Sequence, residues 1–340
     1  MTSQTFVALV LTCFAALAGG CGTQQILLGT EDSYVFLASD SVALPGETVQ
    51  LRAQLQQGDL LQDQVGYVVW FKRDGRIFKA AQTGQDGTAK VSFTPLREGD
   101  FAFQAQPAPI GFEQTPPSPQ DILVACRRAD EPIIVVDLDK TLVASGFSSV
   151  LVGQPVPMER SAEVLARIAQ DHTIVYLTHR PEYFGPKSKA WLKHHNYPTG
   201  PVLLSSVAGF LGGSEAFKTQ MLATLQERFS NIQIGIGDKI SDAAAYLNND
   251  IRAFLILHVP PNASADQIDT LIEELGRLDE RAQVVSGWDE IHEVLFEGKS
   301  YPRSAAQQTL SDLAEARRAA AQTFPATDRD AGGDLPGGAK

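Results

Sequence analysis

The segment IIVVDLDKTL, residues 133–142, joins four apolar β-branched residues to two carboxylates. A short, continuous apolar run of this kind is typical of a strand buried on both faces of a parallel sheet. Asp137 and Asp139 follow at positions i and i+2, which share one face of an extended chain, at the end where open α/β sheets bind ligands. The alternative interpretation is that both side chains only end the strand in a turn.

The two carboxylates also indicate a chemistry. Neighbouring carboxylates repel each other unless a shared proton or a cation lies between them, which favours a hard divalent metal. One carboxylate can then attack phosphorus while the other transfers protons, as phosphoryl transfer through an aspartyl-phosphate requires.

From Pro132 onward, apolar strand-like runs alternate with helical patterns. Ser214 opens a helix whose apolar residues recur every four positions, and Ser264 with Gln267 fits a capping box. Such alternation is typical of a parallel sheet covered by helices on both faces. The predicted strands are 133–136, 173–177, 202–204, 232–236, 253–257 and 283–285.

Polar residues follow these strands at points where parallel strands place them together. Thr178 ends the second strand, and Lys218 lies near the start of the helix opened by Ser214, where an anion is favoured. Asp238 and Asp242 follow the fourth strand at i and i+4, so they share one helical face. Each residue also has a structural alternative. Thr178 could be a strand-end hydroxyl and Lys218 a solvated helix residue. Asp238 and Asp242 could be an N-cap and a surface charge.

Together, these positions resemble the four motifs of the haloacid dehalogenase (HAD) superfamily, whose fold is a Rossmannoid parallel sheet. The resemblance implies that Asp137 is the nucleophile and Asp139 the general acid/base. It also implies that Thr178 and Lys218 bind the phosphoryl group.

The same resemblance implies a Mg²⁺ site. Asp238 would ligate the metal, and Asp242 would support it directly or through a water. Asp137 and the backbone carbonyl of Asp139 would complete the ligand set.

Residues 174–206, 215–231 and 234–251 look like parts of the lipin-type domain within this superfamily. That domain is the catalytic domain of lipins, which are Mg²⁺-dependent phosphatidate phosphatases, and it also occurs in membrane-associated phosphatidylinositol-transfer proteins. The resemblance makes phosphatidate the leading substrate. The chain departs from lipins at Lys140, where they carry Gly, and at Asp238, where they carry Asn.

The stretch between Asp139 and Thr178 is short, and part of it is a helix expected at 161–169. It leaves no room for a large cap domain, and a minimal cap can admit bulky or membrane-embedded substrates. A basic segment follows the second strand, and it either attracts anionic headgroups or is an ordinary solvated helix face. Its residues are Lys187, Lys189, Lys193, His194 and His195.

The N-terminus is typical of an export signal, because residues 6–20 form an apolar stretch too short to span a bilayer as a stable anchor. The sequence LAGGC, ending at Cys21, resembles a bacterial lipoprotein cleavage box. We expect an exported, lipid-anchored protein, placed at the outer membrane if the cell is Gram-negative. Plain secretion and a buried N-terminal helix are the alternatives. Cys126 would be the one free cysteine, without an intramolecular disulfide.

Residues 26–125 alternate between apolar and polar positions and carry turn signals, which predicts an all-β sandwich. This region looks like a bacterial immunoglobulin-like (Ig-like) domain with Trp70 as its core aromatic. Such modules are usually spacers or adhesive units, and no ligand cluster is evident here.

Four segments follow from these patterns: a signal peptide at 1–20, an Ig-like domain at 26–125, a HAD-like domain at 132–298 and an Ala-rich, largely disordered tail at 299–340 with a short helix. The formal net charge of −12 argues against a nucleic-acid partner. The function indicated is Mg²⁺-dependent hydrolysis of a phosphomonoester, with phosphatidate or a related lipid phosphate as substrate. A soluble phosphomonoester and a non-catalytic lipid-phosphate-binding module are the alternatives. The patterns leave the oligomeric state open.

Overall fold

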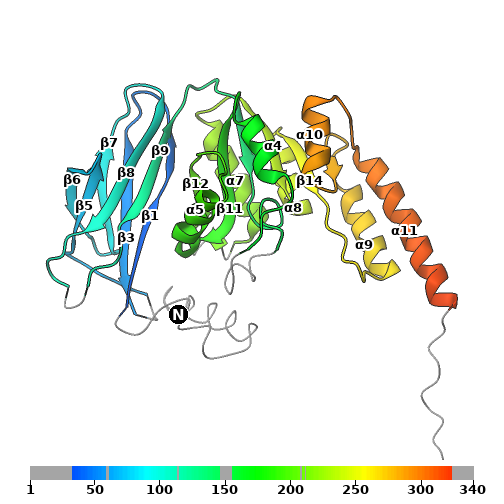
Figure 1. The fold of residues 1–340 in the computed structure, drawn as a ribbon, viewed down its shortest axis with the longest axis horizontal. Coiled ribbons are helices and arrows are strands. Elements are labelled where there is room, and N and C mark those ends of the chain that lie inside the picture. The colour runs from blue at the N-terminus through cyan, green and yellow to red at the C-terminus, as the bar shows by residue number, and fades with distance from the viewer. Residues whose placement is uncertain are drawn as a thin grey trace, which may run out of the picture.

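The computed structural model describes residues 33–58, 61–112, 115–145, 155–206, 209–210 and 212–323. In these residues the chain forms an all-β domain followed by an α/β domain, and the two lie side by side (Figure 1). The predicted signal peptide and Cys21 lie outside the described residues.

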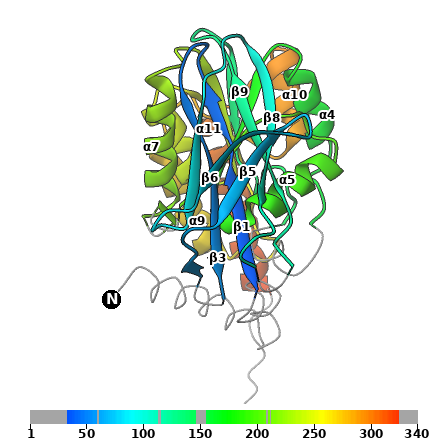
Figure 2. The same cartoon turned by 90° about the vertical axis from the view of Figure 1, so that its left-hand side faces the viewer.

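The N-terminal domain is the predicted Ig-like sandwich (Figure 2). Its strands are β1 (Tyr34–Ser39), β2 (Ser41–Ala43), β3 (Val49–Gln57), β4 (Gln62–Asp63), β5 (Val68–Arg73), β6 (Arg76–Gln82), β7 (Thr88–Phe93), β8 (Gly99–Pro107) and β9 (Gln120–Cys126). One sheet has the order β1-β3-β4 with β7 also paired to β3, and the other has the order β2-β9-β8-β5-β6. The core between the sheets includes Leu51, Leu55, Phe71 and Phe103, and Cys126 is buried and free.

Trp70 is not the core aromatic of this sandwich. Along β5, Val69 and Phe71 are fully buried, and Trp70 between them is only partly buried. Successive residues of a strand point to opposite faces, so Phe71 takes the core position and Trp70 faces outwards. There the ammonium of Lys72 lies 5.5 Å from the Trp70 ring centroid.

The α/β domain is built on one six-stranded parallel sheet of order β12-β11-β10-β13-β14-β15. Its strands are β10 (Ile133–Val136), β11 (Thr173–Pro181), β12 (Val202–Ser205), β13 (Ile232–Gly237), β14 (Arg252–Ile256) and β15 (Gln283–Val285). All six predicted strands are therefore confirmed. All four residues of β10 are fully buried, and successive side chains belong to different core clusters on the two faces.

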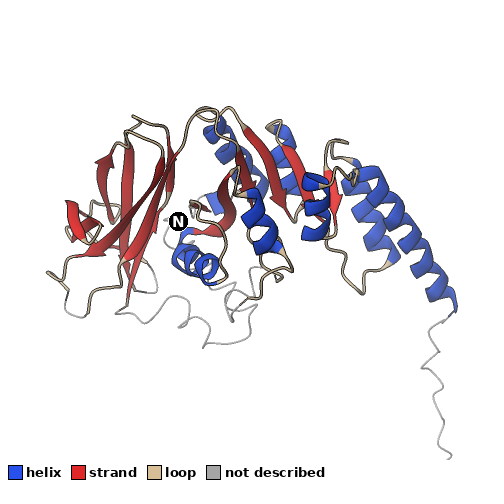
Figure 3. Cartoon of the chain, turned by 45° about the horizontal axis from the view of Figure 1, so that its top comes forward, coloured by secondary structure: helices blue, strands red, loops and turns tan. Residues whose placement is uncertain are grey.

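Helices cover both faces of this sheet (Figure 3). They are α4 (Ser161–Ile168), η1 (Glu182–Phe184), α5 (Gly185–His194), α7 (Ser214–Gln226), α8 (Ile240–Asn248), α9 (Ala265–Gly276) and α10 (Trp288–Phe296). Apolar residues of α7, α8 and α9 share one core cluster, and those of α4, α5 and α10 share the other. Among the described residues between β10 and β11, α4 is the one helix, in agreement with a minimal cap.

The short helix expected in the C-terminal segment is α11 (Arg303–Thr323). It packs on α9, and its Leu310 and Ala314 are buried in the sheet's core cluster, so this part of the segment belongs to the α/β domain. Residues 324–340 lie outside the described residues. Within the described part of the chain, no helix has the length and apolarity that crossing a bilayer requires.

Candidate active site

Parallel pairing places the predicted site residues at one edge of the sheet. Strand β10 lies between β11 and β13, so Asp137, which follows β10, is flanked by Thr178 on β11 and by Asp238 after β13. The backbone N–H of Asp137 extends the ladder by donating to the carbonyl of Ile236 at 2.9 Å. The strand order therefore brings together residues that lie far apart in the sequence, such as Asp137 and Asp238.

Three carboxylates and one ammonium form the centre of this site. Carboxylate oxygens of Asp137, Asp238 and Asp242 lie within 4.8 Å of one another. The Nζ of Lys218, on α7, lies 3.2 Å from Asp137 Oδ1 and 2.8 Å from Asp242 Oδ1. Lys218 is 1% exposed, so it is a buried partner of these carboxylates rather than a solvated helix residue.

The approach of α8 to the sheet depends on two glycines of β13. A Cβ atom on Gly235 would lie 2.2 Å from the ring of Tyr246, and one on Gly237 would lie 2.7 Å from the Cβ of Asp242. Real Cβ atoms do not approach other atoms so closely. Glycine at both positions therefore lets α8 bring Asp242 against the end of β13 and next to Lys218.

Burial and like charge make this cluster unfavourable without a cation. Burial is the largest cause that raises the pKa of Asp137 to about 7; Lys218 acts against the rise and the neighbouring carboxylates add to it. Burial likewise raises the pKa of Asp238 to about 6, with Asp242 as the next cause. Burial opposes the charge of Lys218, yet its pKa is raised because Asp137 and Asp242 stabilise the ammonium. One lysine thus compensates only part of the negative charge.

Two oxygens of the cluster have no hydrogen-bond partner. Asp238 Oδ1 and Asp242 Oδ2 are buried and unpaired within the described residues. A buried carboxylate oxygen without a donor is costly, and hard divalent cations are bound by such oxygens. The residues present therefore fit a Mg²⁺ ion.

The second carboxylate of the 133–142 segment is paired differently. Asp139 accepts two hydrogen bonds from the guanidinium of Arg180, from Nε at 2.9 Å and from Nη2 at 2.8 Å. Arg180 is 3% exposed and also donates from Nη1 to Ser188 Oγ on α5 at 2.9 Å. Arg180 was not among the predicted site residues. Its one sequence signal is its place two residues after Thr178 at the end of a buried strand.

Thr178 lies at the same edge with its side chain buried. It is 1% exposed, and its hydroxyl oxygen accepts from the backbone N–H of Arg180 at 3.3 Å. The bond leaves the hydroxyl proton free to be donated. This placement suits the phosphoryl-binding role that the HAD resemblance implies.

The turn after Asp139 shows why glycine would suit position 140, where this chain carries Lys. Lys140 adopts a φ of +51°, the left-handed region in which glycine is favoured. Its carbonyl lies 2.7 Å from His258 Nε2, and the carbonyl of Thr141 accepts from the indole of Trp288 at 2.7 Å. These contacts hold the turn in the conformation that Gly adopts without strain.

Comparisons with known proteins found similarities to parts of this chain. Residues 134–259, which include the whole carboxylate and lysine cluster, match the family model of the LNS2 domain of PITM 1-3. This match supports the lipin-type domain predicted from the sequence. Together with the parallel sheet, the match is consistent with a HAD-like fold for the α/β region.

Among solved structures, the chain is similar to Ig-like modules. The D00-D0 domain of intimin is 18% identical with a TM-score of 0.22, and the alignment covers 29% of this chain and 49% of that chain. Fibronectin(III)-like modules of Clostridium thermocellum CbhA are 14% identical with a TM-score of 0.20, covering 28% of this chain and 47% of that one. The chain thus spans about half of each of these structures. No curated protein matches the chain.

The carboxylate cluster predicts how the stability of the metal-free protein depends on pH. Asp238 binds its proton more tightly in the folded state, with a pKa of about 6 against 3.8 for the ordinary group. The folded state therefore binds more protons between these values, and stability falls as pH rises through this window. Relative to an Asp238→Asn variant, the wild type should lose about 2 kcal/mol between pH 4 and pH 7.

Urea unfolding of both proteins in EDTA across this pH range measures the difference. Mg²⁺ should reverse the loss in the wild type, because it binds the ionised carboxylates of the folded state only. A pH-independent difference between the two proteins in EDTA would contradict the prediction.

Proposed function

We propose that this chain is a Mg²⁺-dependent phosphomonoester hydrolase that acts through an aspartyl-phosphate on Asp137. The observation that carries the proposal is the cluster of three carboxylates around Lys218, with two buried oxygens left unpaired. A purely structural cluster would gain stability by pairing or removing these oxygens. The match to the LNS2 domain family supports the same assignment.

Each residue of the site has a separate role in the proposed reaction. An oxygen of Asp137 attacks phosphorus as the bond to the ester oxygen breaks, and Asp139 gives that leaving oxygen a proton. A water then attacks the phosphorus, passes its proton to Asp139, and breaks the bond to Asp137 so that phosphate is released. Lys218 neutralises charge on the transferred group, and the hydroxyl of Thr178 donates to one of its oxygens.

Mg²⁺ would be held by Asp137, Asp238, Asp242 and the backbone carbonyl of Asp139. When bound, it supplies positive charge for the phosphoryl oxygens.

We propose phosphatidate or a related lipid phosphate as the substrate. This choice rests on the lipin-type match and on the minimal cap, since only α4 intervenes between β10 and β11 in the described residues. A soluble phosphomonoester is the second candidate. A non-catalytic lipid-phosphate-binding module is the third, and the presence of both Asp137 and Asp139 favours catalysis over it.

Phosphate release from a substrate panel tests the proposal. We expect turnover of phosphatidate in mixed micelles to exceed that of soluble phosphomonoesters by about tenfold or more, and EDTA to abolish it. A preference for soluble esters would contradict the proposed lipid substrate but would remain compatible with the proposed mechanism. Binding of phosphatidate vesicles without phosphate release from any ester would instead support the non-catalytic binding module.

We propose that the mature protein is exported and attached to a bacterial membrane through a lipid on Cys21, so that it meets its substrate at a membrane surface. The LAGGC motif supports this proposal. The mass of the mature N-terminal peptide tests it, since acylation of Cys21 adds the mass of the lipid.

A further inference from the structure

The proposed acid/base Asp139 is connected to the β-sandwich through Arg180 and helix α5. Its partner Arg180 donates to Ser188 Oγ on α5 at 2.9 Å. The next residue on that helix, Lys189, crosses to the sandwich and donates to Asp40 Oδ1 at 2.6 Å. Lys189 also donates to the carbonyls of Asp121 at 2.9 Å and Ala38 at 3.3 Å. One short helix therefore contacts both the catalytic centre and the N-terminal domain.

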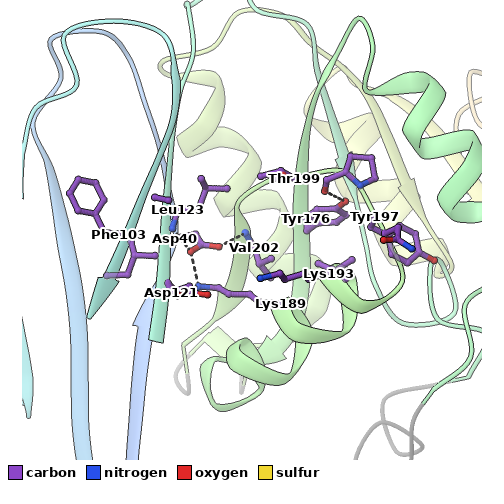
Figure 4. A pocket seen from close by; sticks show the side chains of 16 residues that line it. Asp40, Phe103, Asp121, Leu123, Tyr176, Lys189, Lys193, Tyr197, Thr199 and Val202 are labelled. Carbon is purple, nitrogen blue, oxygen red and sulfur yellow. Dashed lines mark hydrogen bonds and ion pairs between the residues drawn. The ribbon is translucent and has the colours of Figure 1, made fainter. Parts of the chain in front are cut away.

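Asp40 is one of the residues through which the two domains contact each other. It lies between β1 and β2, and its side chain is 3% exposed. One oxygen accepts from Lys189 and from the backbone N–H of Leu123 on β9 at 2.9 Å. The other accepts from the backbone N–H of Val202 on β12 at 3.0 Å (Figure 4). Asp40 thus satisfies a donor on the edge strand of the parallel sheet and pairs with α5 at once.

A second contact reaches the turn between Arg180 and α5. The hydroxyl of Tyr183, in η1, donates to Gln56 Oε1 at the end of β3 at 3.1 Å. Gln56 is 7% exposed, and its amide nitrogen donates to Asp63 Oδ1 at 2.8 Å, which fixes its orientation. The sandwich therefore holds the segment from Arg180 to Lys189 at two separate places.

We propose that the β-sandwich positions the catalytic centre: through Asp40–Lys189 and Gln56–Tyr183 it fixes η1 and α5, which hold Arg180 on Asp139. The catalytic part of this inference rests on the proposed hydrolase function. Arg180, Ser188, Lys189 and Asp40 are positioning residues, and only Asp139 would transfer protons. The sandwich is then a working part of the enzyme rather than a spacer.

The physical basis is the precision that this geometry requires. The guanidinium of Arg180 presents a rigid fork to both oxygens of Asp139, so a shift of α5 is passed to the carboxylate. Displacements of about 1 Å in a reacting group can cost up to about 100-fold in rate. The Asp40–Lys189 pair is suited to hold α5, because a largely buried charge pair with additional hydrogen bonds tolerates little movement.

Variants of Lys189 and Tyr183 test the proposal in the full-length chain. Lys189→Met and Tyr183→Phe should each lower kcat, by about tenfold for Lys189→Met, with KM and the Mg²⁺ requirement nearly unchanged. Lys189→Arg, which keeps the charge, should restore most of the rate. Hydrogen exchange of backbone amides, read by mass spectrometry, should speed up over residues 180–192 in the Lys189→Met and Tyr183→Phe variants.

Arg228→Met is the matched control. Arg228 joins the same two domains by donating to Glu47 at 3.1 Å and to the carbonyl of Val42 at 2.8 Å, but it follows α7 and does not touch α5. We expect near wild-type kcat and unchanged exchange over residues 180–192 for this variant. Equal effects of Arg228→Met and Lys189→Met would overturn the proposal, because they would show a general loosening of the interface.

An unchanged kcat in a Lys189→Met protein whose wild type is active would also overturn it. If the wild-type chain releases no phosphate, that result overturns the proposed hydrolase function but not the positional coupling between the domains. The exchange comparison then decides the positional coupling by itself: faster exchange confined to the Lys189 and Tyr183 variants supports it, and identical exchange in all variants overturns it.

Discussion

An Asp137→Asn variant should release phosphate at least about 10⁴-fold more slowly than the wild type, which corresponds to ~5.5 kcal/mol of activation free energy. The reason is that an amide cannot form the covalent bond to phosphorus on which the proposed mechanism depends. Phosphate release under saturating Mg²⁺ measures the loss. Retained Mg²⁺-dependent turnover in this variant would exclude the covalent mechanism.

The same variant is expected to remain folded, which separates chemistry from stability. Burial and neighbouring carboxylates raise the pKa of Asp137, so replacing its carboxyl by a neutral amide removes an unfavourable charge. Lys218 keeps Asp242 as a partner at 2.8 Å. Without metal, thermal unfolding above pH 7 should therefore occur at a temperature no lower than that of the wild type.

A Lys218→Met variant should lose about 3 kcal/mol or more of unfolding free energy at pH 7 without metal. The substitution leaves Asp137 and Asp242 buried without their ammonium, and an uncompensated buried charge is far more costly than a broken surface ion pair. Denaturant unfolding at fixed pH measures the change. Added Mg²⁺ should recover part of the loss, since it supplies positive charge to the same carboxylates.

Two further variants make this prediction specific. Lys239 lies next to Asp238 in the sequence but is exposed, so Lys239→Met should change the unfolding free energy by no more than about 0.5 kcal/mol. The double variant Lys218→Met/Asp242→Asn should be more stable than Lys218→Met alone, because it removes one of the uncompensated charges. A Lys218→Met protein as stable as Lys239→Met would show that the buried cluster is not charged as described.

The α/β fold could be predicted because its strands are buried on both faces. A strand such as β10 has to be apolar at every position, and this continuous pattern is visible without tertiary information. The parallel order then brings the strand ends together, so residues after separate strands could be assigned to one site. This is why Asp137, Thr178 and Asp238 could be predicted to share one site.

The sandwich was harder to predict in detail, because either face of each strand could be the one that packs in the core. Trp70 and Phe71 are adjacent aromatics, and which one enters the core depends on the register of β5 with β8. Here Phe71 pairs with Ala105, which is buried, and Trp70 pairs with Gln106, which is not. Side-chain size alone favoured the wrong residue.

The carboxylates, the lysine and the strand ends that carry them could be recognised from local sequence patterns, because each has strong physical requirements. Which partner each charge has depends on the tertiary structure. Lys218 lies between Asp137 and Asp242, while Arg180 pairs with Asp139 and Asp40 pairs with Lys189. Such pairings join segments far apart in the chain, and they depend on packing geometry that no local pattern of residues encodes.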